Sequence, residues 1–186
     1  MTYEKFDISR MDRLDDESRF DELDPAVLWE ALDLVNPAVI VEIGAGTGLY
    51  ASLFAAMAPG AVVYAADLAP EMVQRMKDRR PEIVPLQSSE SHVPLDDSSA
   101  NAVVMLLVHH ELADPAASYQ DAARLLAPQG RVLIADVSPD SPRERPPRHI
   151  RASAEKIVAA LEGAGFTDVR PHEVASGYSV VTGTRS

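Results

Sequence analysis

A glycine-rich turn between an apolar run and a helical pattern is the feature that most restricts the fold of this chain. Residues 41–48 read Val-Glu-Ile-Gly-Ala-Gly-Thr-Gly, and the β-branched run 38–43 leads into them. Glycines let the backbone bend sharply and let another group approach it closely. A helix predicted from Leu49 onward would place its free N–H groups and the positive end of its dipole at this turn. A strand, a tight turn and a helix in this order are typical of an α/β sheet.

Strand and helix patterns alternate along most of the chain. Short β-branched or apolar runs predict strands, and apolar positions three and four residues apart predict helices. We expect strands at 38–43, 61–66, 82–86, 101–108, 131–137, 167–174 and 178–184, and helices at 25–35, 49–58, 70–80, 115–126 and 152–161. This alternation predicts a seven-stranded, mostly parallel sheet with helices on both faces. The last two strands are expected to form an antiparallel hairpin.

The length of 186 residues fits a single domain. We expect this domain to cover 1–186, with a core at 25–186 and an N-terminal arm or lid at 1–24. The segment 138–151, which follows the fifth predicted strand, is expected to be a second lid element. It carries the densest basic run of the chain, which we interpret as a solvated loop.

The charge balance restricts the partners. Lys and Arg number 17 and Asp and Glu 29, so the formal net charge is −12. Such an average charge disfavours nucleic acid and anionic membranes as partners. The acidic N-terminal segment shows no basic start followed by an apolar run, so we expect no secretory signal and a cytoplasmic location. Disulfides, thiolate metal sites and cysteine nucleophiles are excluded because the chain has no cysteine.

The charges beside the glycine turn indicate the kind of ligand. Dinucleotide sites require the spacing G-x-G-x-x-G, whereas the third glycine here falls one place early, at Gly48. Glu42 lies two residues before the first glycine, and a carboxylate there suits an amino group and opposes a pyrophosphate. Asp67 follows the second predicted strand, where a carboxylate could accept hydrogen bonds from the two hydroxyls of a ribose. Two alternatives stay open: a tight turn without a ligand, and an Asp67 that only caps the next helix.

Four stretches of the chain together resemble class I S-adenosylmethionine-dependent methyltransferases, in particular the type 11 group that includes enzymes similar to those of ubiquinone and menaquinone biosynthesis. They are VEIGAGTG, VVYAADLAPEM, VPLDDSSANAVVMLLVHHEL and RLLAPQGRVLIAD, in the order and near the spacing of that family. The resemblance implies a Rossmann-like fold and S-adenosylmethionine as the cofactor, with S-adenosylhomocysteine as the product. It does not specify the acceptor.

The resemblance also implies roles for individual residues. Glu42 would reach the methionine end of the cofactor, and Asp67 would hold the ribose hydroxyls. The remaining cofactor contacts would come from the turn, from two residues near the adenine, from the segment after the third strand and from the end of the fourth strand: Gly44, Ala45, Gly46, Gly48, Leu68, Met72, Ser89, Glu90, Leu106 and Leu107. The family usually has an aspartate near the adenine amino group, and this chain has Ser89 at about that place.

His110 and Glu111 follow the fourth predicted strand, at the sheet edge where open α/β sheets bind ligands. We expect this pair to contact the acceptor or to act as a base, because an ordinary histidine titrates near pH 6.5. A purely structural imidazole is the alternative. No metal site is expected, since His109 and His110 are adjacent and need not face the same way.

The predicted function is methyl transfer to a small-molecule acceptor by in-line displacement. Both expected lid elements are short, which predicts a small or open acceptor pocket that a second subunit of a homodimer could complete. One alternative is a methyltransferase-like module that binds the cofactor and serves in regulation or interaction. The glycine spacing disfavours a nicotinamide-dependent oxidoreductase.

Overall fold

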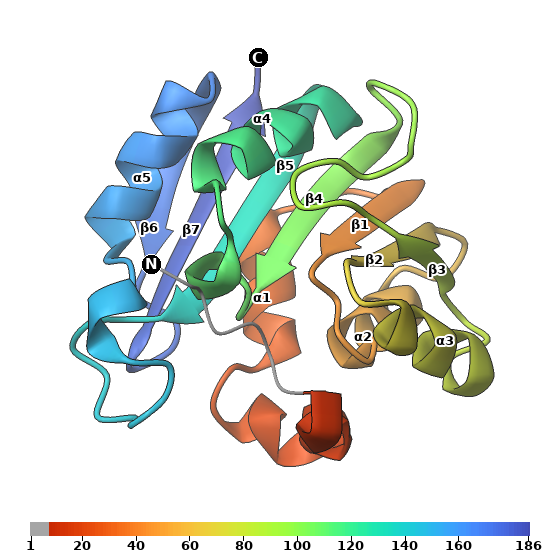
Figure 1. Ribbon diagram of the computed structural model, residues 1–186. Helices are drawn as coiled ribbons and strands as arrows, with labels where there is room; N and C mark the ends of the chain where they lie inside the picture. The colour runs from red at the N-terminus through yellow and green to blue at the C-terminus, as the bar shows by residue number, and fades with distance from the viewer. Residues whose placement is uncertain (1–7) are drawn as a thin grey trace.

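A seven-stranded sheet organises residues 8–186, the part of the chain that the computed structural model describes (Figure 1). Its strand order is β3-β2-β1-β4-β5-β7-β6. The strands are β1 (Val39–Ile43), β2 (Val62–Asp67), β3 (Val84–Gln87), β4 (Ala100–Leu106), β5 (Leu126–Val137), β6 (Phe166–His172) and β7 (Tyr178–Arg185). The first five run parallel, and β7 is antiparallel to both β5 and β6. The predicted α/β sheet with its antiparallel C-terminal pair is therefore confirmed.

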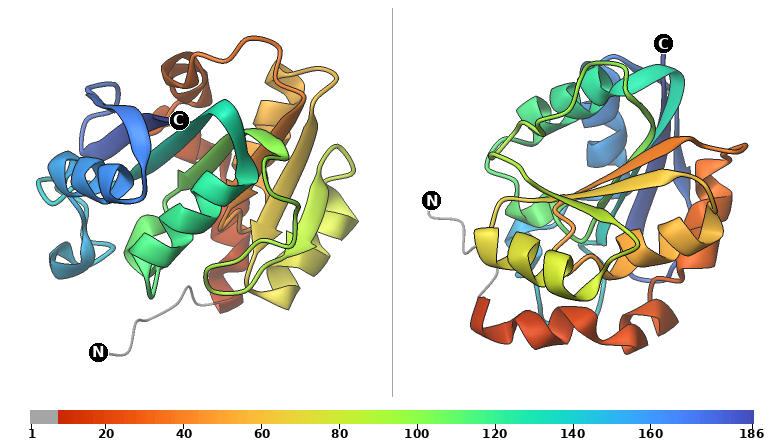
Figure 2. Two further views of the ribbon diagram at one scale, coloured as in Figure 1. Left: turned by 90° about the horizontal axis from the view of Figure 1, so that it is seen from above. Right: turned by 90° about the vertical axis from the view of Figure 1, so that its right-hand side faces the viewer.

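Helices cover both faces of this sheet. The α-helices are α1 (Pro25–Leu32), α2 (Leu49–Met57), α3 (Pro70–Arg79), α4 (Pro115–Leu125) and α5 (Ala154–Gly163). Short 3₁₀ helices occur at η1 (Ile8–Asp15), η2 (Glu17–Asp21), η3 (His109–Glu111) and η4 (Arg148–Ile150). Helices α1, α2 and α3 pack on one face, and α4 and α5 pack on the other (Figure 2). No helix within residues 8–186 is both long enough and apolar enough to cross a membrane.

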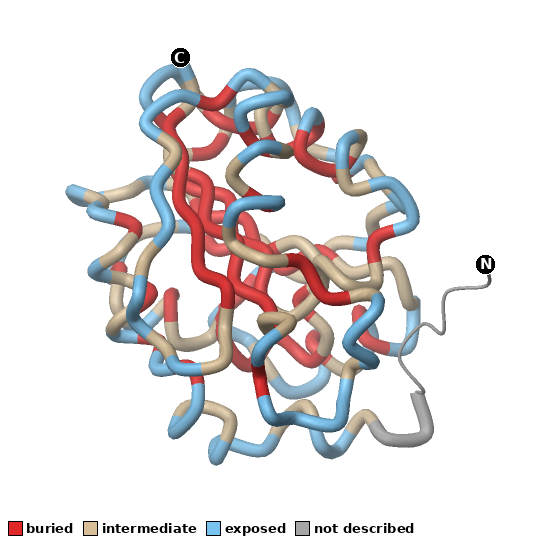
Figure 3. Tube along the Cα trace, turned by 90° about the vertical axis from the view of Figure 1, so that its left-hand side faces the viewer, coloured by how far each residue is buried: buried red, intermediate tan, exposed pale blue. Residues whose placement is uncertain are grey.

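Two apolar cores lie on opposite sides of the sheet, because successive strand residues point to opposite faces. In β1, Ile40 packs into the core with α1–α3, and its neighbour Val41 packs into the core with α4 and α5. Leu133 and Ile134 divide in the same way in β5. The central strands are therefore buried on both sides, as the chain trace coloured by burial shows (Figure 3). A rigid sheet of this kind fixes the positions of the loops at its carboxyl edge.

The first helix ends earlier than its apolar spacing predicts. Asp24 caps it by accepting a hydrogen bond from the N–H of Ala26 at 2.8 Å, as the Asp-Pro start indicated. The helix stops at Leu32 because Asp33 adopts a left-handed conformation with φ 50°. Val35, which was predicted to lie on the helix, is outside it and 85% exposed. The prediction of a helix to residue 35 is therefore wrong.

The fifth strand starts earlier than predicted. Residues 128–130, a Pro-Gln-Gly sequence typical of a turn, form an irregularity inside β5, because Leu126 already pairs with Ala100 and Arg131 pairs with Ala102. Four residues of β5 thus stand opposite one residue of β4. Gln129 in this segment has φ 65°. It therefore occupies a backbone conformation that glycine adopts more readily.

The loop 138–151 is held by one buried arginine, whereas the other three arginines of its basic run, Arg143, Arg145 and Arg148, are exposed as expected for a solvated loop. Arg151 is only 4% exposed. Its guanidinium donates to the main-chain carbonyls of Pro146 at 2.7 Å, Ser141 at 3.0 Å, Ser138 at 3.3 Å and Arg143 at 2.5 Å. These bonds fold the loop on itself.

Candidate functional site

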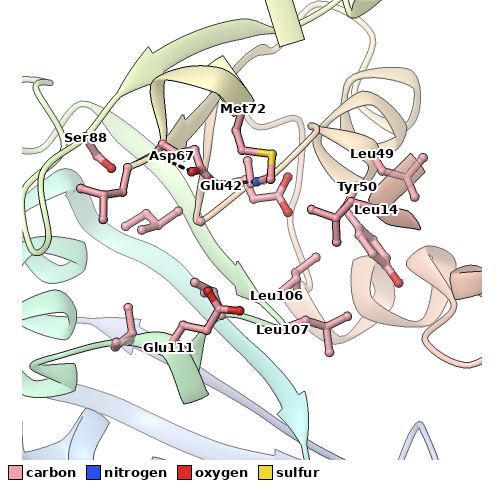
Figure 4. Close-up of a pocket in the computed structure, with 18 of the residues that line it drawn as sticks. Leu14, Glu42, Leu49, Tyr50, Asp67, Met72, Ser88, Leu106, Leu107 and Glu111 are labelled. Carbon is pink, nitrogen blue, oxygen red and sulfur yellow. Dashed lines mark hydrogen bonds between the residues drawn. The ribbon is translucent and has the colours of Figure 1, made fainter. Parts of the chain in front are cut away.

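A cavity of about 350 Å³ opens at the carboxyl ends of β1, β2 and β4 (Figure 4). In open α/β sheets this edge is where ligands bind. Its size lies at the low end of the range for small-molecule pockets. The N-terminal arm contributes Leu14 and Arg19 to the wall, whereas none of residues 138–151 lines the cavity. The second of the two expected lid elements therefore does not reach the site.

The glycine turn forms one wall of this cavity. Gly44 has φ 72°, and its N–H donates to the carbonyl of Ala66 at 2.8 Å. A Cβ atom at Gly44 would lie 2.3 Å from Cγ2 of Val108. The turn therefore needs glycine here both for its backbone conformation and for the close approach of the β4 end. The predicted turn residues Ala45 and Gly46 also line the cavity, whereas Gly48 lies just behind them at the start of α2.

Glu42 is buried against the cavity without a full set of partners. Its side chain lines the site, the residue is 2% exposed, and its Oε2 atom has no hydrogen-bond partner. Burial raises the pKa of Glu42 to about 8, although the charge of Arg19 and an N–H from Ala51 act in the opposite direction. A buried carboxyl group with an unused oxygen is costly. An ammonium group in the cavity would supply the missing donor, so the arrangement fits the amino end of S-adenosylmethionine.

Asp67 is fixed by the backbone at the end of β2. Its Oδ2 accepts from the N–H of Gly46 at 2.7 Å, and its Oδ1 accepts from the N–H of Ala69 at 2.9 Å. Burial raises the pKa of Asp67, and these two N–H groups oppose that shift. A carboxylate has about four acceptor sites, so two remain for the hydroxyls of a ribose. The bond to Ala69 shapes the turn before α3, but the N-cap of this helix is Ala69 itself, so the structure does not bear out the alternative of Asp67 as a helix cap.

The predicted adenine-side residues border the same cavity. Leu68, Met72, Ser89 and Glu90 all line it, and Met72 is buried. Ser88 lines it as well (Figure 4). Ser89 is tied into its own turn, because its N–H donates to the carbonyl of His92 at 2.9 Å. This wall therefore combines apolar surface with short polar side chains.

Leu106 and Leu107 form the wall at the end of β4, as predicted. Leu107 has φ 58°, and its N–H donates to the carbonyl of Ala135 at 2.7 Å. This left-handed residue ends β4 at Leu106, whereas the sequence pattern had predicted a strand that continues to residue 108. The change of direction brings η3 to the cavity.

Of the predicted pair in η3, Glu111 lines the cavity and His110 does not. The Nδ1 atom of His110 lies 2.9 Å from Oδ1 of Asp136, and its Nε2 atom lies 3.6 Å from Oε1 of Glu111. Burial lowers the pKa of His110, but the two carboxylates outweigh it and raise this pKa to about 9. The imidazole is therefore charged near neutral pH, and it does not fit the role of a base there. His109 is structural: its Nδ1 lies 2.7 Å from the hydroxyl oxygen of Tyr119.

The N-terminal arm is held across the cavity by ion pairs. Asp15 pairs with Arg75, and it accepts from Arg80 at 3.1 Å. Near its other end, Glu22 pairs with Arg143 and accepts from the hydroxyl of Tyr178 at 2.6 Å. Residues 1–7 of the predicted arm lie outside the described residues. The use of the arm as a lid stays a prediction.

Among the lining residues that were not predicted from the sequence are Leu14, Arg19 and Tyr50. Tyr50 is buried, and its hydroxyl donates to the carbonyl of Leu23 at 3.0 Å. Arg19 lies over the Tyr50 ring, 5.6 Å from its centre. Leu14 approaches the glycine turn. The weak pattern of apolar residues in the arm gave no sign of the contact between Leu14 and the turn.

Comparisons with known proteins agree with this geometry. A family described as a methyltransferase domain, of type 11, matches residues 41–134. An uncharacterized methyltransferase of Mycobacterium tuberculosis is 35% identical over 111 residues, which are 58% of this chain and 44% of that protein. A probable S-adenosylmethionine-dependent methyltransferase of the same species is 30% identical over 136 residues, 70% of this chain and 49% of that protein. The chain thus spans less than half the length of these curated relatives.

A solved structure extends the likeness to the whole fold. A S-adenosylmethionine-dependent methyltransferase from Aquifex aeolicus has a TM-score of 0.90 and 27% identity, and the match covers 98% of this chain and 100% of that one. The family match includes the glycine turn, β2 and β4, whose carboxyl ends border the cavity. The chain therefore belongs to the type 11 group of class I S-adenosylmethionine-dependent methyltransferases.

Proposed function

We propose that this chain transfers a methyl group from S-adenosylmethionine to a small-molecule acceptor. The observation that carries the proposal is the buried Glu42 side chain, which lines the cavity beside the glycine turn and whose Oε2 has no hydrogen-bond partner. A site that bound no cationic group would gain nothing from this costly arrangement. The family membership agrees with the same cofactor.

Each wall of the cavity has a separate task in this proposal. Glu42 holds the amino group of the methionine end, and Asp67 holds the ribose. Gly44 lets the backbone turn tightly beside the cofactor, because Val108 leaves no space for a side chain at its position. Leu68 and Met72 pack against the adenine, which Ser89 and Glu90 also border.

When bound, the cofactor supplies a methyl group already activated on a sulfonium, which is transferred by in-line displacement. The main work of the chain is therefore to align the two reactants and to exclude water. Leu14, Arg19 and Tyr50 cover the site from the arm and from α2. Glu111 is the carboxylate of the predicted catalytic pair that faces the cavity.

The acceptor is a small, non-anionic molecule in this proposal. Among the described residues, five carboxylate side chains and one guanidinium line the cavity: Glu42, Asp67, Glu71, Glu90, Glu111 and Arg19. This excess of negative groups opposes an anionic acceptor and nucleic acid alike. The cytoplasmic location and the homodimer stay predictions, and light scattering of the purified chain tests the second.

Binding and transfer are tested separately. S-Adenosylhomocysteine should raise the melting temperature of the chain because it binds the folded state, and NAD should not. Transfer of a labelled methyl group from S-adenosylmethionine to a panel of small metabolites then tests catalysis. A chain that binds the cofactor but labels no acceptor would fit a regulatory module instead. A chain stabilised by neither ligand would contradict the proposal.

A further inference from the structure

Asp136, His110 and Glu111 form a chain of alternating charges that ends at the cavity. Asp136, on β5, is 1% exposed. Its Oδ2 accepts from the backbone N–H of His110 at 3.0 Å, and its Oδ1 lies 2.9 Å from Nδ1 of the same residue. Oδ1 also accepts from the N–H of Val137 at 2.6 Å. The buried carboxylate therefore holds both the backbone and the ring of His110.

The other end of the imidazole holds Glu111. His110 Nε2 lies 3.6 Å from Oε1 of Glu111, whose side chain is 26% exposed. The carboxylate of Glu111 points into the cavity (Figure 4). Its charge contributes to the raised pKa of Asp67, so Glu111 and Asp67 act on each other across the cavity. Glu111 is thus held by His110 on one side and faces the cavity on the other.

The surroundings of His110 favour this charge arrangement. The carboxylates that face the ring are those of Asp136 and Glu111. The other titratable groups nearby are His109 on η3 and Tyr119 on α4, whose hydroxyl oxygen lies 2.7 Å from Nδ1 of His109. With the imidazole charged, the three groups carry one net negative charge. That charge is presented at the Glu111 end, because Asp136 is enclosed by its donors.

We propose that Asp136, acting through His110, positions the Glu111 carboxylate as a fixed anion, and that this anion makes the site prefer the sulfonium cofactor to its neutral product. This inference rests on the proposed function. Methyl transfer breaks the bond from sulfur to carbon, and the bonding electrons stay on sulfur, which becomes an uncharged thioether. A fixed anion therefore attracts the cofactor more than the product.

Glu42 does not supply the same preference. Its pKa of about 8 leaves its carboxyl group largely protonated near neutral pH when no cation faces it. Both the cofactor and its product carry the amino group that Glu42 fits, so Glu42 binds the two without distinction. Glu111 is therefore the residue that distinguishes the charged sulfur of the cofactor from the neutral sulfur of the product. This preference would help the product to dissociate.

The experiment compares the Kd values of S-adenosylmethionine and S-adenosylhomocysteine by calorimetry without an acceptor. In Glu111→Gln we expect the preference for the charged cofactor to fall about tenfold, the scale of one charge pair at a partly solvated wall. Asp136→Asn should also lower the preference for the charged cofactor, and Asp136→Glu should restore part of this preference. Glu162→Gln removes an exposed carboxylate from α5, outside the cavity, so it is the control and should leave the ratio unchanged.

A second readout separates positioning from simple loss of structure. In an NMR titration, the His110 ring should titrate near pH 9 in the native chain and nearer its ordinary value in Asp136→Asn. If Glu111→Gln binds the product normally and keeps the native ratio, the inference is wrong. If the native chain binds neither compound, the proposed function itself fails. Glu111 is partly exposed, so its variant tests the inference even if Asp136→Asn does not fold.

Discussion

Replacing Glu42 by Gln should stabilise the ligand-free protein while weakening cofactor binding. Burial raises the pKa of Glu42 from 4.5 to about 8. The folded state therefore binds a proton between these values that the unfolded state releases, so Glu42 makes stability fall as pH rises from about 4.5 to about 8. At about 1.4 kcal/mol for each pH unit, the carboxyl group costs roughly 3 kcal/mol of the free energy of unfolding at pH 7. The buried amide of Gln also lacks full partners, which reduces the expected gain to about 1–2 kcal/mol.

Urea unfolding of the native chain and of Glu42→Gln at pH 5, 6, 7 and 8 measures this effect. The gain should be smallest at pH 5 and should grow with each step, since other titrating groups are common to both proteins and cancel in the difference. Glu71→Gln changes an exposed side chain and should show a small, pH-independent difference of about 0.5 kcal/mol or less. The Kd of Glu42→Gln for S-adenosylhomocysteine should rise at least about tenfold, because a charge-assisted hydrogen bond is lost. A stability difference that stays flat from pH 5 to pH 8 would refute the reasoning.

Three further substitutions test other parts of the fold. Gly44→Ala should lower the free energy of unfolding by about 2–4 kcal/mol and abolish calorimetric binding of S-adenosylhomocysteine, because its Cβ meets Val108 in a left-handed backbone. Gln129→Gly should raise stability in urea by about 0.5 kcal/mol, since relief of its left-handed φ of 65° exceeds the added entropy of the unfolded chain. Arg151→Lys should cost about 2–3 kcal/mol by the same measurement, because an ammonium cannot reach the carbonyls that the guanidinium joins.

The fold was largely predictable because local and long-range preferences agree along the sheet. Buried strands such as β1 and β4 are short apolar runs, and the helices between them carry apolar stripes and clear starts such as Asp24-Pro25. The errors lie where a single backbone angle decides. The left-handed backbone of Asp33 ends α1 early, and the spacing of apolar residues does not indicate the φ angle of this residue.

The candidate site divides in the same way. Glu42 and Asp67 were predictable because each lies at the carboxyl end of a strand, and the carboxyl ends of parallel strands meet at one edge of a sheet. His110 and Glu111 were correctly placed at that edge, but their neighbours in space were not predictable. Asp136 meets His110 only because of the register between β4 and β5, and no local pattern marks an aspartate at the end of an apolar strand as its partner.

Three departures from ordinary protein architecture border the cavity. Among the described residues, six other than glycine have a positive φ, and five of them are polar residues, which tolerate such angles better: Asp33, Asn36, Ser98, Gln129 and Asp168. The sixth is Leu107, an apolar residue that lines the cavity. Beside it stand Gly44, where no side chain fits, and Glu42, whose buried oxygen has no partner. Strain of this kind persists only where the surrounding structure enforces it, and it marks functional sites. The packing of Val108 explains Gly44, whereas the left-handed Leu107 and the unpartnered oxygen of Glu42 favour a ligand that compensates them.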